Sequence, residues 1–170
     1  MTYMLNQWSA RLCAFLLCFV MLAGCTVQLV PAYDSVVVEK LDTLNEDTFV
    51  LLSALENGSS AEEFEDYEPR YNELIGRFDA LRVRTETRHV PTLANRLPVI
   101  SGLELCRTDD NPTACLNTSP AALRDVASQL RTLRDRHRAN GLESGNVALA
   151  RGAIEIGLEQ ATTVENALER

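Results

Sequence analysis

The sequence predicts an all-α protein: a four-helix bundle with a long, disulfide-stapled connection between the second and third long helices. Four segments each place apolar residues at alternating steps of three and four, which is the spacing of one helix face. No segment shows the apolar–polar alternation that is typical of a strand. Because each apolar stripe must be buried against another, a bundle is the simplest solution.

The first predicted helix spans 34–57 and ends at Asn57-Gly58, a common stop signal. Its apolar seam consists of Val37, Leu41, Leu44, Thr48, Leu51 and Leu55. Ser59 and Ser60 follow as candidate N-caps, each with a glutamate three residues later, as in a capping box.

The second predicted helix ends near His89, because Pro91 follows. Its seam consists of Phe64, Tyr67, Tyr71, Leu74, Phe78 and Leu81. Pro69 lies inside this pattern, so we expect it to kink the helix or to reset its start nearby.

The third predicted helix begins with Ser119 as N-cap and Pro120 at the first helical position, and Asn140-Gly141 closes it. Leu123, Val126, Leu130 and Leu133 form its seam. The fourth helix is expected over 145–167. Its seam contains small residues that allow close helix approach: Val147, Ala150, Ile154, Gly157, Ala161, Val164 and Leu168.

The connection over 91–118 is long for a compact domain, and such connections are often functional. We expect one or two short helices in it, with an apolar run from Leu97 to Leu105 that caps the bundle core. Its polar tip is the expected contact surface for a partner: Asp109, Asp110 and Asn111. The alternative is a simple crossover between two helices.

The chain begins with an apolar run after Arg11 that is too short to cross a bilayer and is typical of a secretory signal. The run ends in Leu22-Ala23-Gly24-Cys25, which resembles the lipobox of bacterial lipoproteins. The resemblance covers only this segment. It implies a removed signal peptide (1–24), lipid on Cys25, a lipidated tether (25–32) and a single domain (33–170).

A lipidated Cys25 would anchor the protein to the membrane, because two or more acyl chains give stable binding. Thr26 follows the cysteine where lipoproteins retained in the inner membrane tend to carry Asp, so we expect the periplasmic leaflet of the outer membrane. The net charge of −8 becomes more negative when Arg11 is removed. An acidic surface disfavours nucleic acid as a partner.

The cysteines of the mature chain predict one disulfide bond. Cys13 and Cys18 leave with the signal peptide and Cys25 carries lipid, so Cys106 and Cys115 remain. Two free thiols in an oxidising compartment pair by default. Eight residues separate them, unlike the Cys-x-x-Cys of redox sites, so we expect a structural bond worth about 2–3 kcal/mol.

Residue patterns for catalysis or cofactor binding are weak. All three methionines lie in the signal segment, which excludes His/Met haem ligation in the mature chain. Glu86 and His89 match half of a di-iron carboxylate pattern, but Arg134 stands where His137 would need its glutamate. Both histidines are expected near helix C-termini, where a protonated side chain favours the dipole. We therefore expect no catalytic residue, no metal and no cofactor.

Two charged clusters remain. Acidic residues gather at the start of the second helix and suit the positive end of its dipole: Glu62, Glu63, Glu65, Asp66 and Glu68. They are either a solvated, stabilising feature or a docking patch for a basic partner or divalent cations. Basic residues gather at the end of the third helix, and the two clusters can pair across the bundle or across a dimer: Arg131, Arg134, Arg136 and Arg138.

The sequence therefore favours a membrane-anchored, non-enzymatic binding or scaffolding module with an envelope protein as partner. The first alternative is a metal-binding or enzymatic bundle that uses His89 and Glu86. The second is a carrier of a small ligand held between helices.

Overall fold

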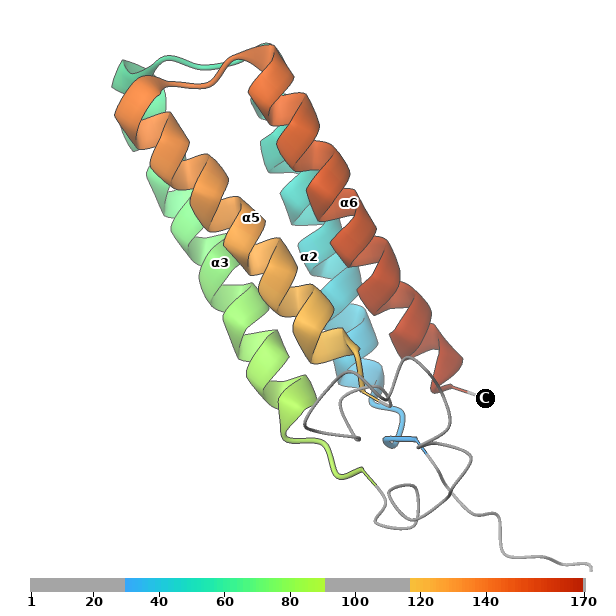
Figure 1. Ribbon diagram of the computed structural model, residues 1–170. Coiled ribbons are helices and arrows are strands. Elements are labelled where there is room, and N and C mark those ends of the chain that lie inside the picture. Colours follow the sequence, from blue (N-terminus) through green and yellow to red (C-terminus); the bar gives the residue numbers. More distant parts are fainter. Residues whose placement is uncertain (1–29, 91–116, 170) are drawn as a thin grey trace, which may run out of the picture.

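The computed structural model describes residues 30–90 and 117–169, and this part of the chain is helical as predicted (Figure 1). Its elements are α2 (Ser35–Ala54), the 3₁₀ turn η1 (Ala61–Glu63), α3 (Phe64–Glu86), α5 (Ser119–Asn140) and α6 (Ser144–Ala167). The described residues form no strand, only one isolated bridge. None of the described helices combines the length and apolarity needed to cross a bilayer.

Each helix runs antiparallel to the one before it, and the four lie side by side (Figure 1). α5 packs against α3 and α6, and α2 packs against the same two helices from the other side. One end of the bundle, called the tip, consists of two short loops, 55–60 and 141–143. The other end, called the open end, holds the start of α2, the ends of α3 and α6, and the start of α5.

The apolar seams form the core, as the spacing predicts. All six residues of the first seam, which are five in α2 and its C-cap Leu55, and all four of the α5 seam are buried. In α3 every seam residue is buried except Tyr67, which is partly buried against the core. In α6 the last seam positions are less covered: Val164 and Leu168 are only partly buried, and Glu165 is buried instead.

The helix ends follow local sequence chemistry, with one correction. Ser60 and Glu63 form the expected capping box, in which the Ser60 backbone N–H donates to Oε2 of Glu63 at 2.8 Å. Gly141 closes α5 with a φ of 72°. The prediction of Ser119 as N-cap is wrong by one residue: Thr118 is the N-cap, and Ser119 already lies in the helix with its side chain buried.

Pro69 does not interrupt α3, since the helix runs from Phe64 to Glu86 with the proline inside it. The proline lies in the second turn, close to the helix start. It removes one N–H that would otherwise bond to the carbonyl one turn earlier. The carbonyl left without this donor belongs to Glu65, and both Glu65 and Pro69 are exposed.

The two tip loops are held together by an antiparallel bridge between Ser59 and Leu142. The Ser59 N–H donates to the Leu142 carbonyl at 3.0 Å, and the Leu142 N–H donates back at 2.7 Å. Gly58 and Gly141 beside the bridge have φ values of 90° and 72°, in the left-handed region that favours glycine. A Cβ at either position would lie within 3 Å of a backbone oxygen of the opposite loop. The bridge therefore requires both glycines.

Candidate functional site

Several residues singled out by sequence lie outside the described part of the chain. These are the predicted lipidation residue Cys25, the predicted disulfide pair Cys106 and Cys115, and the residues of the predicted contact surface, Asp109, Asp110 and Asn111. The flanks of the long connection are described, however. It leaves after α3 and returns before α5, both at the open end (Figure 1).

Glu86 takes part in ion pairs on the surface between α3 and α5. Its carboxylate lies 2.5 Å from the guanidinium of Arg82 and 3.0 Å from that of Arg124. His89 follows three residues later and is exposed. Among the described residues, no group of three His, Cys, Asp or Glu side chains is placed to hold a metal ion.

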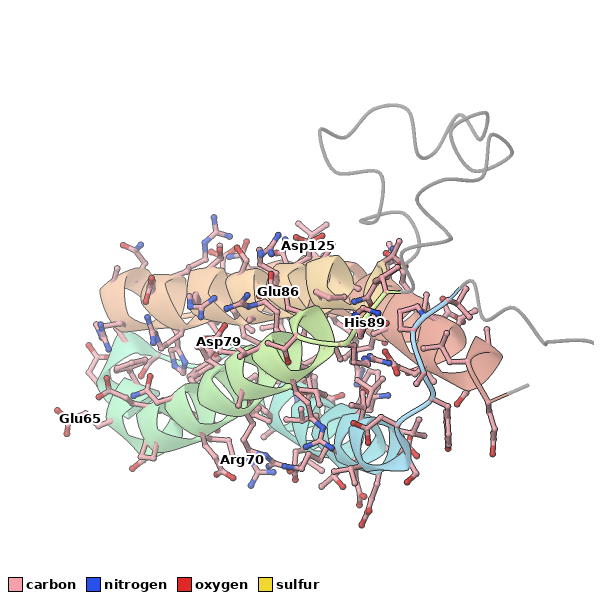
Figure 2. All side chains as sticks on the ribbon, turned by 90° about the horizontal axis from the view of Figure 1, so that it is seen from below. Glu65, Arg70, Asp79, Glu86, His89 and Asp125 are labelled. Carbon is pink, nitrogen blue, oxygen red and sulfur yellow. The ribbon has the colours of Figure 1, made fainter. Side chains whose placement is uncertain are left out.

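The two histidines lie at opposite ends of the bundle. His89 is at the open end, and Glu65 marks the tip at the other end of α3 (Figure 2). His137 belongs to the tip, where its ring contacts the Ser60 carbonyl. The structure therefore does not bring the two histidines together as a two-histidine site would require.

His137 is the centre of a buried aromatic cluster beneath the tip loops. Its side chain has no exposed surface, and the rings of Phe64, Tyr67 and Tyr71 lie with centroids 5.5, 5.5 and 6.0 Å from the imidazole. Nε2 lies 3.1 Å from the carbonyl oxygen of Ser60. Because a carbonyl only accepts hydrogen bonds, Nε2 carries the proton and donates it. His137 thereby fastens the end of α5 to the first tip loop.

Burial of the imidazole ring explains the charge state of His137. Nδ1 faces the Tyr71 hydroxyl at 3.5 Å, at the long limit of a hydrogen bond. Desolvation by burial lowers the pKa of His137 below its ordinary 6.5, while the hydrogen bond to Ser60 opposes this shift. Burial also raises the pKa of Tyr71, which keeps its hydroxyl protonated. The expectation of a protonated His137 at the helix dipole is therefore wrong: the ring is neutral near pH 7 and acts by hydrogen bonding.

Two arginines of the basic cluster of α5 form ion pairs with α3 across the bundle, one of the two arrangements expected from sequence. Arg138 lies 2.5 Å from Glu68 and also stacks over the Phe64 ring at 4.8 Å. Arg131 pairs with Asp79, and Asp79 and Glu86 lie on the side of α3 that faces α5 (Figure 2). Exposed pairs of this kind contribute about 0–1 kcal/mol each.

The rest of the acidic cluster is exposed at the tip. Glu62, Glu63, Glu65 and Asp66 all point to solvent. Hydrogen bonds from backbone N–H groups and from nearby serines lower the pKa values of Glu62 and Glu63, so both stay ionised. Ionised carboxylates at the start of a helix favour its dipole, and the docking patch stays a prediction.

A buried ion pair at the open end has no counterpart in the sequence predictions. Arg88 and Glu165 are 9% and 1% exposed and share two hydrogen bonds. Nearby, the Asn117 side-chain amide donates to the Thr85 carbonyl at 2.9 Å. The spacing Ile154, Leu158, Ala161, Glu165 would have placed this glutamate on the inner face of α6, since it continues the same helical steps.

Comparison with protein-family models, with curated proteins and with solved structures finds no match to the chain. Its function is therefore argued from its own residues.

Proposed function

We propose that the chain is a membrane-anchored lipoprotein of the cell envelope, whose helical bundle acts as a non-enzymatic binding or scaffolding module. The main support is the placement of the two ends of the bundle. The chain enters at the open end, where Asp34 caps α2, and the tip lies at the far end of the helices (Figure 1). A helix of 20 residues is about 30 Å long, so an anchor near residue 25 holds one end close to the bilayer and directs the tip away from it.

The lipobox-like Leu22-Ala23-Gly24-Cys25 supports lipid attachment at Cys25. From Cys25 to Asp34 the backbone spans at most about 30 Å when fully extended. The open end would then stay near the periplasmic leaflet of the outer membrane, the leaflet that Thr26 favours.

The partner surface that we propose is the connection over 91–118, and the contact residues in it are Asp109, Asp110 and Asn111. Both ends of the connection are fixed to the open end, by Arg88 to Glu165 and by Asn117 to Thr85. The proposed disulfide between Cys106 and Cys115 would reduce the entropy lost when a loop is ordered by a partner. A protein bound there would lie next to the membrane.

The anchor is tested by fractionating cells that express Cys25→Ser. We expect the protein to lose palmitate labelling and to leave the membrane fraction. Cys18→Ser is the matched control, because it removes a cysteine from the same segment and leaves the lipobox unchanged. A Cys25→Ser chain that still labels with palmitate would contradict the lipoprotein assignment.

The binding role is tested by crosslinking in native membranes and co-purification. Alanine at Asp109, Asp110 and Asn111 should abolish partner recovery, with helicity and melting nearly unchanged. Alanine at Glu65 and Asp66, on the exposed tip, provides the matched control. If partner recovery depends on Glu65 and Asp66 instead, the contact surface is the acidic cluster. Stoichiometric iron, copper or zinc in protein purified without chelator would contradict the non-enzymatic role.

A further inference from the structure

The outer surface formed by α5 and α6 carries apolar side chains that no described segment covers. Leu149 and Ile156 of α6 are 76% and 68% exposed, the highest values among the large apolar side chains of residues 30–90 and 117–169. A hollow of about 180 Å³ next to Leu149 is lined by residues of both helices, so the two helices share this surface. Four positions of each helix, spaced by four, three and four residues, make up the surface, called the α5–α6 face. They are Asp125, Gln129, Thr132 and Arg136 of α5, and Leu149, Ala153, Ile156 and Gln160 of α6.

Two of these eight positions are charged, and neither charge is neutralised within the bundle. Arg136 donates to the Asn146 side chain at 2.7 Å, and Asp125 lies on the side of α5 turned away from α3 (Figure 2). Neither forms an ion pair with any residue of the described ranges, whereas Arg131 and Arg138 of the same helix both do. Along α5 the two charges are about 16 Å apart, so they do not pair with each other in one copy.

The charged pair and the apolar pair have the same midpoint along the bundle. Gly157 of α6 packs against Val126 of α5, and Asn146 is joined to Arg136, so these contacts align the two helices. With this alignment the midpoint of the two charges, between positions 130 and 131, lies level with positions 152 and 153 of α6. The midpoint of the two large apolar side chains lies between the same positions 152 and 153. One two-fold axis across both helices therefore serves both pairs.

We infer that the α5–α6 face binds a second copy of the chain in an antiparallel, two-fold symmetric dimer. In such an interface each contact between two different residues occurs twice, once in each direction. Asp125 of each copy lies opposite Arg136 of the other, and Leu149 lies opposite Ile156. The residues at 152–153 are glycine and alanine, whose small size lets the two α6 helices approach closely at the axis.

The two charges favour the antiparallel arrangement. If the copies ran parallel with like residues opposed, Asp125 would meet Asp125 and Arg136 would meet Arg136, and both contacts are repulsive. The antiparallel arrangement puts the two open ends at opposite ends of the dimer. If both copies carry the proposed lipid anchor in one bilayer, the bundle axes of the dimer lie along the membrane, whereas a single copy directs its tip away from it.

Sedimentation equilibrium of the mature chain in a density-matched neutral detergent measures the dimer, whether or not Cys25 carries lipid. We expect a reversible equilibrium between monomer and dimer. Leu149→Asp and Ile156→Asp should each raise the dissociation constant at least tenfold, because each substitution enters the interface twice. Both side chains are exposed, so helicity by circular dichroism should not change. Val50→Asp is the matched control, since Val50 is 53% exposed on α2.

Charge reversal tests the pairing of the two helices directly. Asp125→Arg and Arg136→Asp should each weaken the dimer at least tenfold, because each creates two like-charge contacts. The double variant exchanges the two charges and should regain the wild-type dissociation constant. Asp42→Arg is the control, because Asp42 is exposed on α2 and also lacks an ion pair within the described residues. A chain that stays monomeric at millimolar concentration would assign the face to another partner and overturn the inference. Equal losses in the controls, or a double variant as weak as the single ones, would overturn it as well.

Discussion

The guanidinium of Arg88 and the carboxylate of Glu165 form a buried ion pair at the open end, with Nη1 donating to Oε2 at 2.9 Å. The pair joins the residue that follows the C-cap of α3 to the last turn of α6. Both charges have been removed from water, and each depends on the other for compensation. Loss of a single charge is therefore costly at this pair, the one ion pair within residues 30–90 and 117–169 whose two side chains are both buried.

Glu165→Gln is expected to lower the free energy of unfolding by about 3 kcal/mol, because it leaves the Arg88 cation buried without a counter-charge. Replacing both partners, with Arg88→Met and Glu165→Leu, should restore most of that loss. Chemical denaturation measures both effects. Glu155→Gln is the control, since its pair with Arg151 is half exposed and worth about 0.5 kcal/mol or less. A loss below 1 kcal/mol in Glu165→Gln would mean that the pair is solvated.

Stability should fall with acidification because of His137. Its pKa is lowered in the folded protein, so the unfolded chain takes up the proton first. The contribution of the neutral ring is complete above pH 6.5, declines as the pH falls below 6.5, and levels off below the folded-state pKa. Denaturation of wild type and His137→Gln between pH 8 and pH 5 measures the difference. An equal decline in both proteins would assign the pH dependence to other groups.

Glycine-to-alanine substitutions should lower the stability of the protein at the tip and raise it within the helices. Gly58→Ala and Gly141→Ala place a Cβ 2.5 and 2.8 Å from backbone oxygens at positive φ, so both should destabilise the tip. Gly76→Ala and Gly152→Ala lie in helices with open space around the new Cβ, and each should stabilise by about 0.5–1 kcal/mol. Thermal melting of the four variants tests this. Similar losses at all four would show that the left-handed backbone is not the cause.

A Cys106–Cys115 bond remains a prediction from sequence, since both residues lie outside the described part of the chain. Mass spectrometry of the unreduced mature protein should show a peptide that links the two cysteines. Reduction should loosen the 91–118 connection more than the helices, because the bond closes a short local loop. Hydrogen exchange before and after reduction measures this. Alkylation of both cysteines without prior reduction would refute the bond.

The helices could be predicted because their signals are local. The bounds of α5 follow from Ser119-Pro120 and Asn140-Gly141, and the seam of α2 follows from its spacing alone. Which helices pack against each other could not be predicted from such local signals. The contact between Arg131 and Asp79 joins residues 52 positions apart. From sequence, the acidic and basic clusters could pair either within the bundle or across a dimer.

The two buried polar sites were missed for different reasons. Glu165 was passed over because the seam was continued through Val164, although Ala161 and Glu165 are also one helical step apart. His137 was expected to be a cation at the C-terminal end of its helix, since nothing in that helix shows that the Ser60 loop folds over it. Burial of a residue near a helix end depends on a distant segment, and periodicity within one helix does not contain that information.

The bundle is also a pair of helical hairpins. α2 and α3 are joined by one short loop, α5 and α6 by the other, and the 91–116 segment links them only at the open end. Each half joins two helices that are near neighbours in the chain, and the halves meet where α3 packs on α5 and α2 packs on α6. Covalent continuity through 91–116 raises the effective concentration of one half around the other. A break in that segment would turn folding into a bimolecular reaction between two complementary fragments, with a stability that depends on their concentration.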